Sequence, residues 1–387
     1  MSSIRLGEIG KISMCKRILK SQTNEFSGIP FYKISTFGGT PTVYIDEKIY
    51  REYKEKYSYP KKGDILISAA GTIGKTVIFD GEDSYFQDSN IVWIENDESK
   101  VTNQFLYYFL QTNPFITTNG STIKRLYNDN LRDTKIPNVP SIQQQNQITD
   151  ILGTLDKKIQ INNQINQELE AMAKTLYDYW FVQFDFPDQN GKPYKSSGGK
   201  MVYHPELKRE IPEGWGVESV GNLLDKVTKA EKIENNSIEF IGKIPVIDQS
   251  QKYIAGFTNN ENGLIQPQNG HVIFGDHTRV VKYINFDYAR GADGTQVLIS
   301  NNENISNVLL YHMIEDFDLS NYGYARHFKF LKEKLVIVPD KKISLQFANK
   351  ADVIYKKIRN NIFENQELTQ LRDWLLPMLM NGQVKVE

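Results

Sequence analysis

The sequence is poor in the residues that build disulfides and metal sites. Cys15 is the only cysteine among 387 residues, which excludes an internal disulfide and a zinc site made of several cysteines. Five histidines are present, and they form no closely spaced pair that would indicate metal ligands. We therefore expect a protein that binds no metal.

Long apolar runs are also missing. No stretch reaches the roughly 18 apolar residues of a membrane-spanning helix, and the first residues lack the apolar core of a signal peptide. We therefore expect a cytoplasmic protein that makes no membrane contact. Hydrophobic residues still form 40% of the chain, which is typical of folded domains, and the length favours at least two of them.

Neither sign of charge is in excess. Lys and Arg total 46 against 47 Asp and Glu, so a uniformly basic nucleic-acid coat is excluded. The charge is nevertheless uneven, with a net +2 over residues 1–140, −1 over 141–211, −5 over 212–340 and +3 over 341–387. A local basic surface is compatible with this near-neutral chain.

The chain contains an internal duplication with a period near 200 residues. Lys157–Leu169 and Lys356–Leu368 align at an offset of 199, and residues 143–180 share ten identities with residues 342–379. Composition alone predicts roughly two or three identities over that length. A period this long indicates two copies of a domain and excludes a solenoid of short repeats.

Each copy is predicted to be a β-rich globule followed by a long helix. Short β-branched runs lie between Gly, Asn and Asp residues, and a helix is predicted at Asn103–Gln111. The predicted strands are Asp64–Ser68, Thr76–Phe79, Asn90–Ile94, His271–Phe274 and Gln296–Ile299. The fold class that follows is α+β, with two β-rich domains and two long helices.

These patterns divide the chain into five predicted segments. The connector is rich in Pro, Gly and Ser, so we expect it to be loop-like. The segments are a first globule at 1–142, a central helix at 143–185, the connector at 186–216, a second globule at 217–340 and a C-terminal helix at 341–387.

Both helical segments carry narrow apolar stripes. One stripe of the central helix repeats every seven residues, and the other is expected to slip once in phase. The first stripe is Ile148, Leu155, Asn162, Leu169 and Leu176, and the second follows Leu152, Ile159, Ile165, Met172 and Tyr179. Asn361 takes the place of Asn162 in the second copy. If the helices pack antiparallel, these two asparagines face each other and set the register. Alternatively, each helix docks on its own globule and both asparagines are exposed.

No catalytic motif is complete. Gly71–Thr76 ends like a phosphate-binding loop, but Ala69 stands where the first glycine is required, and a strand-like run follows. Asn113–Phe115 lacks the second proline of an amino-methyltransferase motif, and Pro339–Lys342 lacks the partner residues of a nuclease site. No Gly-rich cofactor loop or nucleophile–base pair is recognisable. We therefore expect a protein that binds its target and does not catalyse a reaction.

Each globule has a basic loop after its glycine-led strand and a second one near its end. Arg125 and Arg326 match at an offset of 201, and Lys75 and Lys282 match at 207. Such loops can contact phosphates through Lys and bases through Arg. The candidate contact residues are Thr72, Lys75, Lys124, Arg125 and Arg132 in the first globule, and His277, Thr278, Arg279, Lys282, Arg326 and His327 in the second. For any one of them the alternative is ordinary solvated surface charge.

Over essentially its whole length the chain resembles the DNA-specificity subunit of type I restriction–modification systems. The segments that carry the resemblance are Gly63–Gly74, Gln145–Ile159, Ala173–Phe181, Asp185–Pro187, Gly191–Tyr194, Ile211–Trp215 and Leu371–Gly382. The resemblance implies two target-recognition domains and two helices in an antiparallel coiled coil. Each domain would read one half of a bipartite, asymmetric DNA site, and the helices would set the gap between the halves.

The resemblance also implies partners and cofactors. Two modification subunits would dock on the helices and supply S-adenosylmethionine-dependent adenine methylation, and restriction subunits would supply ATP- and Mg-dependent translocation and cleavage. The chain itself would bind double-stranded DNA and hold no cofactor. Two alternatives stay open: an accessory or fused protein with its own methyltransferase or nuclease activity, and a purely structural coiled-coil adaptor.

Overall fold

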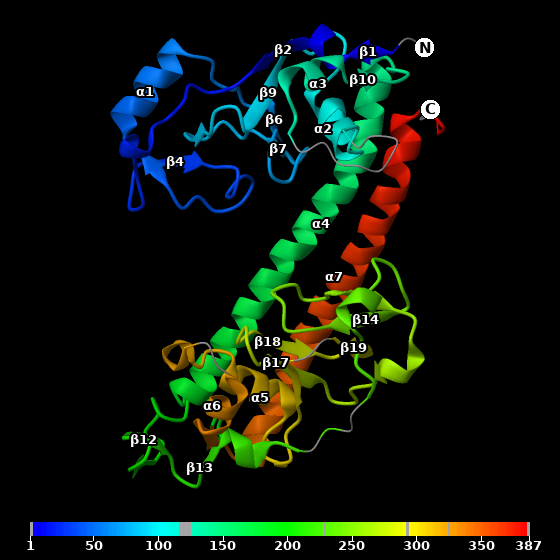
Figure 1. Ribbon diagram of the computed structural model, residues 1–387. Helices are drawn as coiled ribbons and strands as arrows, with labels where there is room; N and C mark the ends of the chain where they lie inside the picture. Colours follow the sequence, from blue (N-terminus) through cyan, green and yellow to red (C-terminus); the bar gives the residue numbers. More distant parts are fainter. Residues whose placement is uncertain are drawn as a thin grey trace. The chain divides into compact units, whose positions relative to one another are not determined.

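The computed structural model describes residues 3–115, 125–225, 227, 230–291, 294–323 and 326–384. The chain forms two compact units: the first unit is Met1–Ile159 with Gln366–Glu387, and the second unit is Gln160–Asn365. Each unit contains one β-rich globule and part of both long helices, α4 (Ile142–Tyr177) and α7 (Lys341–Met380) (Figure 1).

The globule of the first unit contains two four-stranded sheets. One is antiparallel with the order β2–β9–β6–β7, and the other has the order β3–β5–β4–β8, in which β4 and β8 are parallel. The strands are β2 Gly10–Ser13, β3 Thr23–Asn24, β4 Ile29–Tyr32, β5 Tyr44–Ile45, β6 Ile65–Ser68, β7 Thr76–Ile78, β8 Tyr85–Phe86 and β9 Ile91–Asn96. A further pair and three helices complete it: β1 Ile4–Arg5 with β10 Lys135–Ile136, and α1 Glu47–Lys56, α2 Asn103–Gln111 and α3 Asn128–Asp133.

The globule of the second unit has the same plan. A three-stranded antiparallel sheet has the order β18–β17–β20, and a four-stranded sheet has the order β15–β14–β19–β16, in which β14 and β19 are parallel. The strands are β14 Ile244–Ile247, β15 Gly256–Thr258, β16 Leu264–Ile265, β17 His271–Gly275, β18 Val281–Ile284, β19 Tyr288–Arg290 and β20 Thr295–Leu298. The accompanying elements are the pair β13 Gly216–Ser219 with β21 Leu335–Val338, and the helices α5 Asn307–Ile314 and α6 Phe328–Lys332.

The two globules are therefore copies of one fold. The hairpin β6–β7 corresponds to β17–β18, and the parallel pair β4–β8 corresponds to β14–β19. Helices α2 and α3 likewise correspond to α5 and α6 by their order in the chain. The α+β class and the domain duplication predicted from the sequence are confirmed.

The connector differs from the expected loop. It contains the hairpin β11 (Met201–His204) and β12 (Arg209–Pro212), and it is anchored by stacked rings. The Phe186 ring stacks on Tyr194 at 4.6 Å and on Trp215 at 4.8 Å between centroids. Aromatic packing of this kind supplies apolar burial that a count of Pro, Gly and Ser does not reveal.

Both long helices begin directly after a proline, with a polar residue that caps the first turn. Ser141 Oγ accepts a hydrogen bond from the Gln144 N–H at 3.3 Å, and Asp340 Oδ1 accepts one from the Lys342 N–H at 2.7 Å. Capping oxygens satisfy backbone N–H groups that have no partner within the helix. The nuclease-like run at Pro339–Lys342 is thus a helix start.

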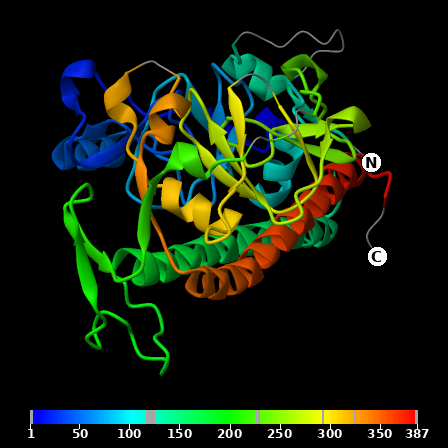
Figure 2. The same cartoon turned by 90° about the horizontal axis from the view of Figure 1, so that it is seen from below.

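The helices pack against each other along heptad seams, side by side in both views (Figure 1, Figure 2). In the second unit Tyr177 of α4 meets Phe347 of α7, while Asn166 meets Asn361, so the two helices run antiparallel. In the first unit Arg372 Nη1 lies 2.8 Å from Asp156 Oδ1, and Asp156 also accepts a hydrogen bond from the Tyr108 hydroxyl at 2.7 Å. The predicted antiparallel coiled coil is confirmed.

The second stripe of α4 differs from its prediction. The seam continues without a slip, in strict heptads, through Leu152, Ile159, Asn166 and Ala173 of α4, and it reaches Trp180 in the π-helical turn Asp178–Val182 that follows. Ile165, Met172 and Tyr179, which were expected in the seam, are instead exposed. The heptad period of the buried residues was mispredicted at Asn166, because only apolar residues were expected in the stripe and this position holds a buried amide.

Candidate nucleic-acid interface

The loop between β6 and β7 is a tight, internally bonded turn that displays Thr72. Gly71 and Gly74 have φ of +66° and +81°, a conformation that favours glycine. The Ser68 hydroxyl donates to the Thr72 carbonyl and accepts the Lys75 N–H at 2.9 Å, and the Gly74 N–H donates to the Ser68 carbonyl at 3.0 Å. Thr72 and Lys75 are exposed on this turn.

Arg125 lies beside this loop. The neighbouring Leu126 N–H donates to the Ala69 carbonyl at 2.8 Å, which places the segment against the base of the turn. The exposed Arg125 guanidinium donates to the Ser89 carbonyl at 3.4 Å and lies 6.0 Å from the centre of the exposed Tyr127 ring. Arg125 and Tyr127 therefore offer a hydrogen-bonding fork and a flat ring at one surface.

The equivalent turn of the second unit lies between β17 and β18. His277, Thr278 and Arg279 are exposed, and Arg279 has a φ of +64°. Gln249 supports the turn, since its side-chain oxygen accepts the His277 N–H at 3.1 Å and its backbone carbonyl accepts the Thr278 hydroxyl at 2.6 Å. A non-glycine residue in this conformation is uncommon and is often found at functional sites.

The buried Asp276 joins this turn to α6. Its carbonyl accepts the His327 N–H at 2.9 Å, and its carboxylate accepts the Phe328 N–H at 2.8 Å. His327 Nδ1 also lies 3.0 Å from the Asp276 carbonyl, and the His327 side chain is buried. Arg326 is exposed next to this contact.

The same backbone hydrogen bond therefore occurs in both globules. Leu126 N–H to the Ala69 carbonyl in the first unit corresponds to His327 N–H to the Asp276 carbonyl in the second. Each bond fixes an exposed arginine, Arg125 or Arg326, one residue before its donor. The sequence match between these two arginines thus reflects equivalent places in the fold.

Two of the predicted lysines act mainly as clamps. Lys75 Nζ donates to the Phe37 carbonyl in the loop after β4, and Lys282 Nζ donates to the Asp248 carbonyl at 2.8 Å and to the Lys252 carbonyl, in the loop after β14. Lys282 is buried, which lowers its pKa to about 8 by desolvation against the opposing effect of Asp248. We correct our prediction accordingly: Lys282 and His327 are buried structural residues, whereas Lys75 is a clamp that stays exposed.

Two further predicted residues have other outcomes. Arg132 on α3 pairs with Asp129 at 3.0 Å, and its side chain covers Gly7, where an added Cβ would lie 2.2 Å from Arg132 Cγ. Lys124 lies outside the described residues. Tyr127 and Gln249 were missed from the sequence, because only the folded turns show that they flank the exposed arginines.

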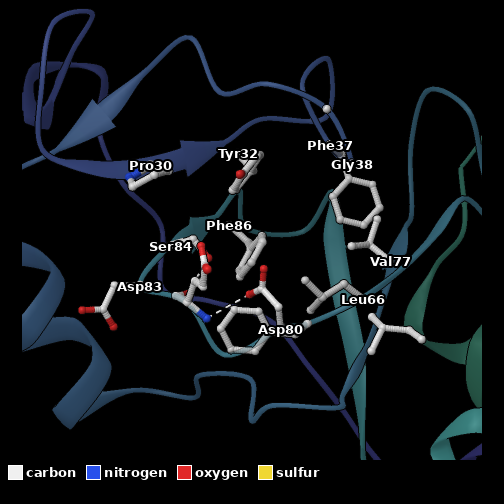
Figure 3. A pocket seen from close by; sticks show the side chains of 14 residues that line it. Pro30, Tyr32, Phe37, Gly38, Leu66, Val77, Asp80, Asp83, Ser84 and Phe86 are labelled. Carbon is white, nitrogen blue, oxygen red and sulfur yellow. Dashed lines mark hydrogen bonds between the residues drawn. The ribbon is translucent and has the colours of Figure 1, made fainter. Parts of the chain in front are cut away.

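A small cavity of the first unit has the wrong chemistry for a phosphate. It holds about 130 Å³ between β4, β7 and β8, and apolar side chains that include Phe37, Leu66 and Phe86 form its walls (Figure 3). Asp80, Glu82 and Asp83 also line it, and the Lys54 ammonium lies 3.2 Å from the Asp83 carboxylate. Carboxylates repel a polyanion, so the two turns are the better candidates for nucleic acid.

Asn162 and Asn361 are both buried between the helices but do not meet. Asn162 Nδ2 donates to Asn365 Oδ1 at 2.9 Å and to Glu364 Oε2 at 2.7 Å, whereas Asn361 Nδ2 donates to Asn166 Oδ1 at 2.8 Å. The pairs 162–365 and 361–166 exchange under the offset of 199, so the layer has the symmetry expected of the duplication. The predicted facing of Asn162 and Asn361 is wrong, because each amide pairs with a residue one helical turn away on the other helix. A role of this polar layer in setting the register stays a prediction.

Nothing among the described residues resembles a metal or thiolate site. No group of three potential His, Cys, Asp or Glu ligands occurs in the described ranges. Cys15 is buried, and desolvation raises the pKa of its thiol to about 12. The helices that the structure describes include none with a long enough apolar stretch to cross a membrane.

Similar proteins were found by sequence. Residues 1–171 match a family described as the type I restriction modification DNA specificity domain. A Haemophilus influenzae protein described as a type I restriction enzyme specificity subunit is 53% identical over 180 residues, which are 46% of this chain and 46% of that protein. The MjaIX type I restriction enzyme specificity subunit of Methanocaldococcus jannaschii is 26% identical over 357 residues, 84% of this chain and 78% of the relative. The chain thus spans about half the length of the first relative.

A solved structure shares the fold. The S subunit of a type I restriction–modification system from M. genitalium superposes with a TM-score of 0.54 and 16% identity, covering 98% of this chain and 95% of that one. The duplicated globules and paired helices are therefore an architecture already known in a solved protein.

Proposed function

We propose that this chain is a DNA specificity protein of a type I restriction–modification system and that it selects the double-stranded DNA site on which such a system acts, since its residues 1–171 match that family's DNA specificity domain. The observation that supports this most is the pair of equivalent, exposed arginines, Arg125 and Arg326, each fixed beside a rigid hairpin turn. A rigid turn presents side chains to base edges with little loss of conformational freedom on binding.

Each globule would read one half of a bipartite site. Arg125 with Tyr127 and Thr72 would face the first half, and Arg326 with the turn His277–Arg279 would face the second. Arg can bond to guanine through two hydrogen bonds, and each such pair is worth about 1–3 kcal/mol of discrimination. The side chains of the two turns differ, so the two halves would differ and the whole site would be asymmetric.

The helix pair would set the gap between the halves and hold the modification subunits. An exposed apolar stripe follows one face of α4 in the second unit, at a spacing of four and then seven residues. It consists of Ile161, Ile165 and Met172 of α4 and continues to Tyr179 in the π-helical turn Asp178–Val182. Exposed apolar stripes of this kind mark protein interfaces, and two modification subunits, joined by restriction subunits, would be the partners.

The chain would contribute recognition and no chemistry. Its relatives are described as specificity subunits, and methyl transfer and cleavage would be carried out by the partners. S-adenosylmethionine, ATP and Mg would accordingly bind the partner subunits. The complex would act on DNA in the cytoplasm. A chain with its own methyltransferase activity would instead bind S-adenosylmethionine in isolation, which calorimetry can measure directly.

The test is to replace Arg326 or Arg279 by Ala and to measure DNA binding by fluorescence anisotropy in complex with the modification subunit. Loss of one base contact weakens specific binding about 5- to 150-fold, as expected for 1–3 kcal/mol. The Lys208→Ala variant is the matched control, since it removes one exposed charge of the second unit from the connector. Unchanged affinity and unchanged methylation pattern in both arginine variants would refute the assignment.

A purely structural adaptor makes a different prediction. It would show no sequence-dependent DNA binding even with its partners present, and Arg125→Ala and Arg326→Ala would leave all DNA affinities equal. The recognition proposal requires instead that Arg125→Ala relaxes only one half of the site and Arg326→Ala only the other.

A further inference from the structure

The two globules share a short motif at the start of corresponding strands. Glu25-Phe-Ser-Gly28 precedes Ile29-Pro30 at the start of β4, and Glu239-Phe-Ile-Gly242 precedes Ile244-Pro245 at the start of β14, with one inserted lysine. Strands β4 and β14 are equivalent, because each pairs in parallel with the later strand β8 or β19. The motif therefore recurs at one place in the duplicated fold.

The phenylalanine of each motif points into solvent. Phe26 is 90% exposed and Phe240 is 77% exposed, which are the two largest exposures of large hydrophobic side chains among the described residues. A single exposed apolar residue is ordinary on a protein surface. Two at equivalent positions, each more exposed than any other large apolar side chain described, call for a common cause.

Each motif is held firmly by its own globule. Asn24 Oδ1 accepts the Phe26 N–H at 2.9 Å and the Ser27 N–H at 3.0 Å, so a local turn fixes the first phenylalanine. Glu239 exchanges two backbone hydrogen bonds of 2.8 Å with Phe257 on β15, which fixes the residue before Phe240. The exposure thus belongs to an ordered surface.

The glycine of each motif allows the backbone to pack closely on a neighbouring strand. A Cβ at Gly28 would lie 2.4 Å from the Ile45 carbonyl oxygen on β5, and Gly28 has a φ of +123°. A Cβ at Gly242 would lie 2.8 Å from Phe257 Cβ on β15. Since β5 and β15 are the equivalent neighbours of β4 and β14, both motifs pack closely on the same strand of the fold.

Both phenylalanines lie at the strand ends that face away from the candidate DNA turns. Lys75, beside the first turn, bonds to the Phe37 carbonyl after the end of β4. Lys282 bonds to the Asp248 carbonyl directly after the end of β14. Phe26 and Phe240 precede the starts of these same strands, so they lie toward the opposite strand ends.

We infer that Phe26 and Phe240 anchor two equivalent docking sites for one protein partner that binds in two copies, one on each globule. Surfaces that read two different half-sites have to differ, and the turns at Thr72 and His277 do differ. A surface kept the same in both copies fits a ligand that is the same at both ends. A buried aromatic anchor typically dominates a protein interface.

The proposed partner is the modification subunit, so this inference rests on the proposed function. Glu25 and Glu239 are exposed next to the two rings, so the complementary surface on the partner would be an apolar pocket with basic residues at its edge. Each globule would then add a second contact to the one proposed for the helices.

The experiment measures how many purified cognate modification subunits bind the full chain, by calorimetry and sedimentation velocity. Phe26→Ala and Phe240→Ala are each expected to leave one site with wild-type affinity and to weaken the other at least about tenfold; the double variant weakens both. Tyr203→Ala, at a 62% exposed aromatic on β11, is the control and is expected to change neither site. Since all three side chains are exposed, the variants should fold, and circular dichroism would verify it.

The other outcomes overturn the inference in distinguishable ways. Two sites of unchanged affinity in Phe26→Ala and Phe240→Ala would show that the rings are not anchors, while wild-type binding of two subunits would leave the proposed function intact. Unchanged partner binding with weakened DNA binding would make the rings DNA contacts. If the wild-type chain bound no modification subunit, the proposed function would fail together with the inference.

Discussion

The asparagine pairs between α4 and α7, Asn162 with Asn365 and Asn361 with Asn166, give a prediction about stability. Whether a substitution lowers the stability depends on whether one or both partners of a pair are replaced. In Asn361→Leu, the amide that donates to Asn166 Oδ1 at 2.8 Å is removed, and Asn166 keeps a polar side chain that is only 9% exposed. An unsatisfied buried polar group costs about 1–3 kcal/mol. Replacing both partners, as in Asn361→Leu with Asn166→Leu, leaves no unpaired buried amide. The stability of this double variant is expected to lie within about 1 kcal/mol of the wild type or to be higher than the wild type.

The assay is native-state hydrogen exchange followed by mass spectrometry of peptides from the middle of α4 and α7. It reports the free energy of local opening, and does not require the whole chain to unfold in one step. The single variant should exchange about 5- to 150-fold faster at these peptides, which corresponds to 1–3 kcal/mol. Gln164→Leu, at an exposed position of the same stretch, is the control and should change the rate little. A single variant that exchanges more slowly than the wild type would refute the pairing.

Three further predictions follow from individual contacts. Asp276→Ala removes the acceptor of the Phe328 N–H, so it should destabilise the second globule by about 1–2 kcal/mol in thermal unfolding and weaken recognition of one half-site only. Burial lowers the pKa of Lys282 to about 8 in the folded chain, so between pH 8 and about 10.5 the unfolded chain binds more protons than the folded chain. The unfolding free energy of the wild type, measured relative to Lys282→Met, should therefore rise by about 2 kcal/mol from pH 8 to 10. Denaturant titrations in which this difference does not change with pH would contradict the prediction. Met172→Asp should weaken binding of the modification subunit at least about tenfold in calorimetry, because it charges a 58% exposed position of the α4 stripe, and it should leave the free chain's melting temperature unchanged.

Much of the fold could be predicted, because duplication and hydrophobic pattern are local signals. The helix at Asn103–Gln111 was predicted with its correct ends, and Thr102 caps it by accepting the Phe105 N–H at 3.2 Å. The run Asp64–Ser68 was predicted as a strand, and the observed strand Ile65–Ser68 is buried along its whole length in the middle of its sheet. Such elements can be predicted from the sequence by their cap residues and uninterrupted β-branched runs.

The errors arose where the meaning of a residue depends on its distant neighbours. Lys75 and Lys282 match in the sequence because both clamp the loop after an equivalent strand, and this role cannot be told from phosphate binding by spacing alone. The helix seam was mispredicted at Asn166, because an asparagine is expected to be exposed unless a buried partner, here Asn361, is known.

The candidate site was predicted best where the two copies could be compared. Arg125 and Arg326 were matched through their offset, and both lie beside the same backbone hydrogen bond. Tyr127 and Gln249 have no counterpart that the sequence alone would single out. Duplication therefore served as an internal alignment, and it was informative only for residues that both copies retain.

The most direct test of the central claim is to co-express the chain with its modification subunit in a methylation-free host and to sequence the methylated genome. We expect adenine methylation at a bipartite, asymmetric sequence whose two specified halves are separated by a gap of fixed length. Arg125→Ala should relax one half of that motif and Arg326→Ala the other, with the gap unchanged. A single continuous motif, or a methylation pattern indifferent to both arginines, would contradict it.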